Sequence, residues 1–104
     1  MVRIHGNWCG PGWTAGRAVD ALTYKEGGGT FNEPCIDALD CACRKHDRDC
    51  AHPDGCSRKG DTDLIKAALK ISLDPRNRLL RPDYANKAGL IAAGITAART
   101  GRKR

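Results

Sequence analysis

The chain has 104 residues, of which 40% are apolar and 5% aromatic, so we expect one domain with a thin core. No run of about 18 apolar residues is present, which excludes a membrane-spanning helix. Residues 1–57 carry six basic and eight acidic side chains, whereas residues 58–104 carry twelve basic and four acidic ones, for a net charge of +6. The basic half predicts attraction to polyanions such as nucleic acid or an anionic membrane, although "RTGRKR" (99–104) also fits a disordered tail.

Six cysteines in so short a chain predict disulfides and an oxidising compartment. We therefore expect a protein that is secreted or otherwise delivered outside the cytoplasm that produces it. The N-terminal "MVRIHGNWCGPG" lacks the apolar run of a signal peptide. This leaves open a leader outside this sequence, a domain cut from a longer protein, or another export route.

The first third of the chain predicts little regular structure. "GNWCGPG" (6–12) holds three glycines and a proline in seven positions, a composition that fits neither a helix nor a central strand. Residues 13–34 include "EGGGT" and predict an irregular loop, with a short helix around "AGRAVDAL" (15–22).

The first long helix is predicted from about Ile36 to Ala51. Asn32 can cap it, and Pro34 is tolerated in its first turn. At about 100° per residue, seven residues fall on one broad face: Ile36, Leu39, Asp40, Cys43, His46, Asp47 and Cys50. His46 and Asp47 should therefore both border the core.

A second helix should open at Asp61 or Thr62, after the loop 52–60, and end near Leu73. Its predicted buried face consists of Leu64, Ala67, Ala68 and Ile71.

"DPRNRLLRPD" (74–83) is expected to end the second helix, and a third helix should run from about Tyr84 to Arg99. It carries a stripe of small and branched residues, Ala88, Ile91, Ala92 and Ile95. Its apolar run, residues 88–98, is too short to cross a bilayer, so we expect it to pack in the core.

His46 and Asp63 are expected to meet across the first two helices. A ten-residue connection usually makes two helices antiparallel neighbours, so the end of the first lies beside the start of the second. Asp63, on the side of Ala67, could then fix the tautomer of His46 as a general base. Asp61 is the weaker alternative, and the helix dipole alone also explains an acid in a first turn.

Asp47 indicates a bound cation. Calcium takes about six to eight oxygen ligands, many of them backbone carbonyls, and the glycine-rich "WCGPG" (8–12) can turn several carbonyls inward. A disulfide from Cys9 to Cys43 would anchor this loop one helical turn from His46 and Asp47.

Three segments resemble the calcium-dependent secreted phospholipase A2 superfamily. "WCGPG" (8–12) looks like its calcium loop, "DCACRKHD" (40–47) like its catalytic-helix signature, and "GDTDLIKAAL" (60–69) like the segment that carries its second-helix aspartate. The resemblance covers roughly residues 6–70. It implies a mainly α, small, disulfide-stapled fold, in which a calcium loop and two antiparallel helices carry the site and a third helix follows.

The domain organisation implied by this resemblance is a single domain over residues 1–104. Residues 1–35 would form the calcium loop and an irregular insert, 36–73 the catalytic helix pair, and 74–104 the C-terminal helix and basic tail.

The resemblance also implies a reaction, the hydrolysis of the sn-2 ester of glycerophospholipids at a membrane interface. His46 would take a proton from a water, and Asp63 would hold the far side of its imidazole. Calcium would be bound by the carboxylate of Asp47 and the backbone carbonyls of Trp8, Gly10 and Gly12. The ion and the Gly10 N–H would stabilise the oxyanion, without a covalent intermediate.

The sequence departs from the superfamily pattern at several places. Ala42 stands where a second adjacent cysteine is usual, so one common disulfide is missing. About 27 residues separate Gly12 from Asp40, and "YKEGGGTF" (24–31) could form a flap near the substrate. The usual aromatic partner of the histidine–aspartate pair is not obvious, although Tyr84 is a candidate.

Helix geometry limits the other disulfides. In a continuous helix Cys35 would lie about 22 Å from Cys50, and Cys41 about 13 Å from it, beyond the roughly 7 Å limit between Cα atoms. Once Cys9 pairs with Cys43, the remaining pairs are Cys35–Cys41 and Cys50–Cys56. The first pair requires Cys35 to lie outside the helix.

Two alternatives use the same residues differently. Cys41, Cys43, His46, Cys50 and Cys56 could form a zinc cluster in a basic, nucleic-acid-binding module, but the spacing lacks a CxxC knuckle. An inactive toxin-like binding module of the same superfamily is the other, and the complete set of site residues argues against it.

Under the phospholipase interpretation no nucleic acid is expected. The partner is a phospholipid surface, probed by apolar residues such as Trp8, Trp13 or Leu22 at the mouth of the site. The basic half could draw the protein to anionic headgroups or bind a flanking domain or another protein.

Overall fold

The chain is mainly helical in a computed structural model that describes residues 2–104. Over these residues it forms five helices and no strand: α1 (Ala21–Glu26), α2 (Ala38–Cys50), α3 (Arg58–Leu73), α4 (Pro75–Leu80) and α5 (Pro82–Arg99). The predicted fold class, a small helical protein stapled by disulfides, is confirmed at this level. None of the described helices is both long enough and apolar enough to span a bilayer.

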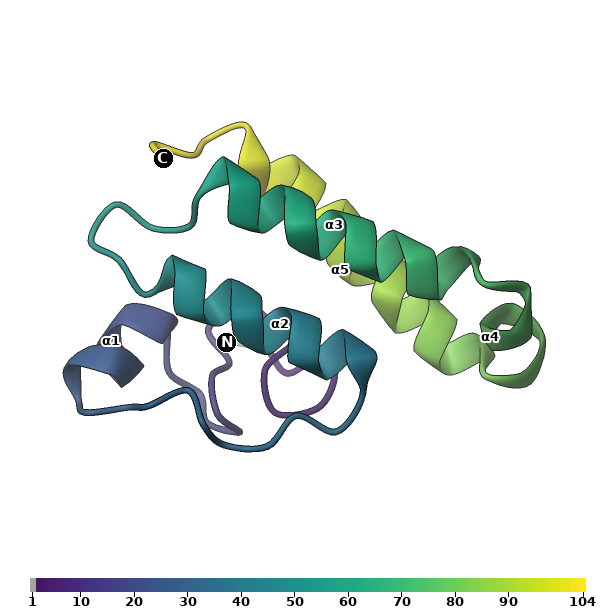
Figure 1. Ribbon diagram of the computed structural model, residues 1–104, viewed down its shortest axis with the longest axis horizontal. Coiled ribbons are helices and arrows are strands. Elements are labelled where there is room, and N and C mark those ends of the chain that lie inside the picture. Colours follow the sequence, from purple (N-terminus) through teal and green to yellow (C-terminus); the bar gives the residue numbers. More distant parts are fainter. Residues whose placement is uncertain (1) are drawn as a thin grey trace.

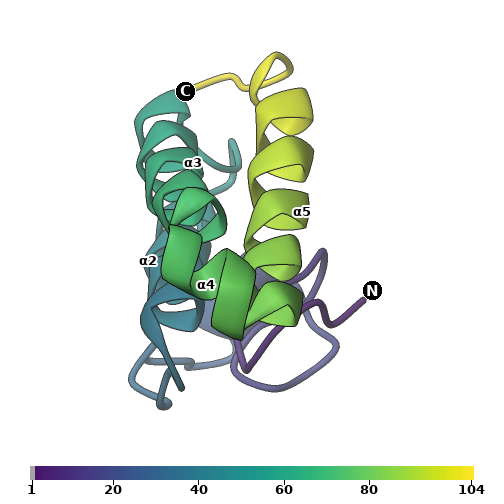
Figure 2. The ribbon, with the colours of Figure 1, turned by 90° about the vertical axis from the view of Figure 1, so that its right-hand side faces the viewer.

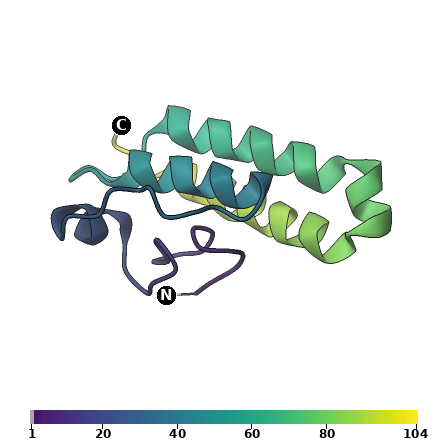
Figure 3. The same cartoon turned by 60° about the horizontal axis from the view of Figure 1, so that its bottom comes forward.

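The two longest helices, α3 and α5, lie side by side and are joined at one end by α4 (Figure 1). Helix α2 runs antiparallel to α3, and Figure 2 shows α2 and α3 on one side of the molecule with α5 on the other. The N-terminal loop and α1 lie against α2 on the side away from α3 (Figure 3). The C-terminal tail returns to the start of α3, at the same end of the molecule as α1 (Figure 1).

Helix α2 begins two residues later than predicted, because its cap is Asp37 and not Asn32. The Asp37 carboxylate accepts a hydrogen bond from the backbone N–H of Asp40 at 2.9 Å, which is the usual N-cap contact. Ile36 therefore lies outside the helix and is exposed. Pro34 also lies outside, and its carbonyl accepts hydrogen bonds from upstream side chains.

Helix α3 begins three residues earlier than predicted. Ser57 is its cap and accepts a hydrogen bond from Gly60 N–H at 3.0 Å. Asp61 consequently lies one turn inside the helix, on the stripe that carries Leu64 and Ala68, and all three side chains are buried.

The predicted break of the second helix at residues 74–83 is present, because α3 ends at Leu73, but this segment also contains the short helix α4. The carboxylate of Asp74 caps α4, and Pro75 occupies its first turn, where a proline costs no hydrogen bond. The short helix expected around residues 15–22 lies at α1 instead, capped by Asp20.

The core has two parts. Small residues on α5 pack against α3 as predicted, and Ala88, Ile91 and Ala92 are buried. Beneath α2, the rings of Trp8, Tyr24 and Phe31 form an aromatic cluster with centroids 4.8–6.1 Å apart.

All three predicted disulfides are present: Cys9–Cys43, Cys35–Cys41 and Cys50–Cys56. Cys35 lies before the first turn of α2, as the second pair requires. The first disulfide attaches the N-terminal loop to the middle of α2, and the third attaches the end of α2 to the loop before α3. The first and third disulfides therefore fix the two loops next to α2, the N-terminal loop and the loop before α3.

Candidate functional site

His46 and Asp61 form a buried pair between α2 and α3. The imidazole Nε2 lies 2.7 Å from Asp61 Oδ1, and the two residues are 7% and 0% exposed. Because a carboxylate accepts hydrogen bonds, this contact favours the tautomer with the proton on Nε2. Nδ1 is then left unprotonated as a base.

The prediction that Asp63 holds the imidazole is wrong. Asp63 lies on the same side of α3 as Ala67, as expected, but that side is not the buried one. Its carboxylate pairs with Lys59, one turn earlier, at 3.0 Å. Asp61 has the contact because it shares the buried stripe of α3 with Leu64.

A third side chain, that of Arg102, binds the aspartate of this pair. Arg102 donates from Nε to Asp61 Oδ2 at 2.6 Å and from Nη2 to Oδ1 at 3.2 Å. Burial acts to raise the pKa of Asp61, but the hydrogen bonds from Arg102 and His46 outweigh it and hold the pKa below its usual range. The aspartate at the centre of this arrangement is therefore an anion at neutral pH.

The N-terminal loop is attached to α2 by Asp40, whose carboxylate is fully buried. Its two oxygens accept backbone N–H groups of Asn7, Trp8 and Ile36 at 2.9–3.1 Å. Gly6 lies directly against this carboxylate with φ +60°, and a Cβ there would collide with it. The loop therefore approaches α2 closely at this point.

The backbone of residues 8–12 borders the same cavity as His46. Gly10 has φ +143°, and a Cβ would collide with the backbone of Val2, so only glycine fits. Within residues 2–104 the Gly10 N–H and the carbonyls of Trp8 and Gly12 make no hydrogen bond, whereas the Gly10 carbonyl accepts from Trp13 N–H at 3.2 Å.

Asp47 is half-buried, but its Oδ2 atom is buried and has no hydrogen-bond partner among the described residues. Burial, with a smaller effect of the nearby Asp40 carboxylate, raises the pKa of Asp47 to about 9. A carboxylate oxygen in such surroundings needs either a proton or a cation. Asp47 is thus the group in the cavity that would gain most from a bound ion.

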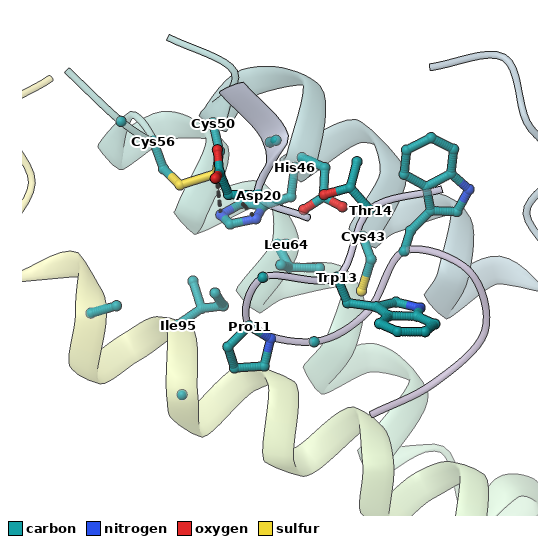
Figure 4. A pocket seen from close by; sticks show the side chains of 18 of the residues that line it. Pro11, Trp13, Thr14, Asp20, Cys43, His46, Cys50, Cys56, Leu64 and Ile95 are labelled. Carbon is teal, nitrogen blue, oxygen red and sulfur yellow. Dashed lines mark hydrogen bonds between the residues drawn. A yellow bond between two sulfur atoms is a disulfide. The ribbon is translucent and has the colours of Figure 1, made fainter. Parts of the chain in front are cut away.

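His46, Asp47, Arg102 and the glycine-rich loop line one cleft of about 560 Å³ between the N-terminal loop, α1, α2 and α5. Figure 4 shows the His46 imidazole next to the Cys50–Cys56 disulfide, with Pro11 and Trp13 of the loop opposite it. Apolar residues of α5, among them Ile95, form the far wall. The imidazole Nδ1 lies 3.5 Å from Cys50 Sγ.

The apolar residues predicted around the mouth, Trp8, Trp13 and Leu22, separate into two groups. Trp13 and Leu22 are half-buried and line the cleft. Trp8 also borders it but is 1% exposed and belongs to the core, so its assignment to the mouth is wrong. Tyr84 is not a partner of the His46–Asp61 pair. Its hydroxyl instead accepts a hydrogen bond from the backbone N–H of Leu39.

A zinc cluster built on cysteine is disfavoured by the disulfides. Zinc binds thiolates, and all six cysteines are paired. The sulfurs of Cys50 and Cys56 do lie close to the ring of His46, but they are bonded to each other.

Two residues of the site had no assigned role in the sequence analysis. Asp40 was placed on the inner face of the first helix, and a buried acid on that face was the available signal. Arg102 gave no signal, because the tail that carries it has no periodicity.

A scan against protein-family models, a search of curated proteins and a search of solved structures each gave no match.

Proposed function

We propose that the protein is a calcium-dependent phospholipase A2 that hydrolyses the sn-2 ester of glycerophospholipids at a membrane interface. The observation that carries the proposal is the position of Asp47 next to the buried His46–Asp61 pair. One oxygen of Asp47 is buried and has no partner among the described residues. The resemblance of residues 8–12, 40–47 and 60–69 to that superfamily points to the same activity.

The chain supplies a base and a donor for this reaction. His46 accepts the proton of an attacking water at Nδ1, while Asp61 fixes the ring through Nε2 and stabilises the imidazolium that forms. The free N–H of Gly10 is available to the oxyanion. The apolar walls of the cleft, formed by Leu22, Leu64 and Ile95, suit an acyl chain.

The residues present fit a calcium ion. Asp47 offers a carboxylate oxygen that no residue in the described range 2–104 satisfies, and hard oxygen donors are the ligands calcium prefers. We assign the ion to Asp47 and the carbonyls of Trp8, Gly10 and Gly12, of which the Gly10 carbonyl must exchange its contact with Trp13. When bound, calcium supplies Lewis-acid stabilisation of the oxyanion.

The proposed partner is a phospholipid surface rich in anionic lipid. The net charge of +8 on residues 58–104 favours association with such a surface. The three disulfides are consistent with an oxidising compartment, and we propose that the protein acts outside the cytoplasm that produces it.

The proposal is tested with vesicles of phospholipid labelled in the sn-2 acyl chain, assayed in calcium. We expect the wild type to release the labelled fatty acid and His46→Gln to lose at least about 100-fold of this activity. His52→Gln is the matched control, because His52 borders the same cleft but bonds only a loop N–H. A parallel assay uses lipid labelled in the sn-1 chain instead. Equal activity of His46→Gln and the wild type, or release of label from the sn-1-labelled lipid alone, would contradict the proposal.

A further inference from the structure

The C-terminal tail folds back onto the site instead of extending into solvent. The Arg104 carbonyl accepts the N–H of Arg58 at 3.1 Å, at the start of α3. The Arg104 guanidinium donates to the carbonyls of Asp49 and Gly55 at 2.9 and 2.8 Å. These contacts lie on the α2–α3 connection, so the tail is fixed at both helices that hold the pair.

This position of the tail brings the guanidinium of Arg102 to the buried carboxylate of Asp61. Arg102 engages both oxygens of Asp61, in the fork geometry that only arginine offers to a carboxylate. Its side chain is 21% exposed, whereas that of Asp61 is 0% exposed. Exposed ion pairs contribute little, but a fully buried carboxylate without a cation is costly.

The geometry points to Arg102 as a positioning residue for the reaction proposed above, on which this inference rests. We infer that it holds Asp61 ionised and in the rotamer that receives the Nε2–H of His46. Without Arg102 only one oxygen of Asp61 keeps a side-chain partner, so the carboxylate is free to take up a proton or rotate. The imidazole then loses its fixed tautomer.

Kinetics test the inference with two tail variants. Arg102→Gln should lower kcat about tenfold or more, which is part of the 10²–10⁴-fold that a well-placed base contributes, and leave KM unchanged. Arg102→Lys should restore part of the loss, because it returns the charge without the fork. Lys103→Gln is the matched control, since Lys103 carries the same charge and is exposed.

A double-mutant cycle separates this role from simple tethering of the tail. If Arg102 acts through Asp61, adding Arg102→Gln to Asp61→Asn should cause no further fall in kcat. A further tenfold fall, or an Arg102→Gln variant that matches Lys103→Gln in kcat, would overturn the inference.

A readout without substrate covers the case in which the wild type shows no lipid hydrolysis. In ¹H–¹⁵N spectra the hydrogen-bonded Nε2–H of His46 should give a downfield signal protected from exchange in the wild type and in Lys103→Gln. It should weaken or vanish in Arg102→Gln, in a protein whose thermal unfolding remains cooperative. An unchanged signal would overturn the role of Arg102, whereas absent hydrolysis with a sensitive signal would count only against the proposed function.

Discussion

His46 and Asp47 are neighbours on α2 that lie in opposite electrostatic surroundings. The imidazole of His46 has its Nε2 atom bound to an anion, whereas Asp47 has one buried oxygen without a partner in the part of the chain that the structure describes. His46 can therefore take up a proton, whereas Asp47 can give up its proton when a cation binds. The contrast arises because Asp61, which Arg102 holds, bonds the imidazole of His46, whereas no described residue bonds Oδ2 of Asp47.

Asp47→Asn should stabilise the calcium-free protein, increasingly so as the pH rises. The folded pKa of Asp47 is about 9 against an ordinary value of 3.8, so between these pH values the folded state holds a proton that the unfolded state has lost. Stability therefore falls with rising pH in the wild type, and asparagine removes this contribution. Thermal unfolding in chelator at pH 5 and pH 8 measures the difference.

Calcium should raise the midpoint of the wild type at pH 8 and leave Asp47→Asn unchanged, because only the folded wild type binds the ion. An identical calcium response of both proteins would place the ion elsewhere.

Asp61 and Asp63 offer a matched pair of substitutions on one helix. Asp61→Asn should lower the hydrolysis rate at least about 100-fold, since an amide cannot stabilise the imidazolium. Asp63→Asn removes only an exposed pair with Lys59, which contributes little to stability, and should leave the hydrolysis rate nearly unchanged. Steady-state rates decide the assignment, and a larger loss in Asp63→Asn would reverse it.

At the scale of elements, the site depends on how the N-terminal loop is attached to α2. Asp40 gathers three backbone N–H groups from the loop and the segment before α2, and the Cys9–Cys43 disulfide lies one turn further along the helix. The contact is close enough that the loop residue against Asp40 must be glycine.

Gly6→Ala should destabilise the protein by about 1–3 kcal/mol more than Gly28→Ala. Both glycines have positive φ, +60° and +93°, but a Cβ at Gly6 collides with Asp40 while one at Gly28 meets nothing. The control therefore removes the backbone strain common to both, and the remainder is the cost of overpacking. Urea unfolding measures the two values, and equal losses would contradict the close attachment of the loop.

Local patterns predicted the three long helices and the pairing of the cysteines, because helical periodicity and the reach of a disulfide are short-range properties. They failed at helix boundaries, where Asp37 and Ser57 cap α2 and α3. The assignment of Asp63 instead of Asp61 as the partner of His46 had a similar cause. The two residues are only two positions apart, and only packing against α2 and α5 decides which of them is buried.

Arg102 was unpredictable for a different reason. Its contact with Asp61 spans 41 positions in the sequence, and nothing local in "RTGRKR" distinguishes a docked tail from a free one. The interpretation of that segment as disordered is wrong for this structure, which places Arg104 against the α2–α3 connection.

At the scale of the whole molecule, α4 forms one end (Figure 1), and its exposed side chains are both apolar and basic. Leu79 and Leu80 are 80% and 75% exposed, and Arg76 and Arg78 beside them are also exposed. Such a combination favours contact with an anionic interface.

Under the proposed function, the protein should therefore sediment with vesicles containing phosphatidylserine more than with vesicles of phosphatidylcholine alone. The difference should shrink as salt rises. The double variant Leu79→Ser/Leu80→Ser should bind less than the control Val2→Ser, which removes an exposed apolar side chain elsewhere. Equal binding to both vesicle types would contradict the predicted attraction.

The central claim is that one cleft joins a held imidazole to a cation site, and the calcium dependence of hydrolysis by the wild type tests it most directly. Fatty acid release from vesicles containing anionic lipid is followed in calcium, then in excess chelator, then after calcium is restored. We predict release that stops in chelator and resumes with calcium. Release that continues unchanged in chelator, or no release in any of the three conditions, would contradict the claim.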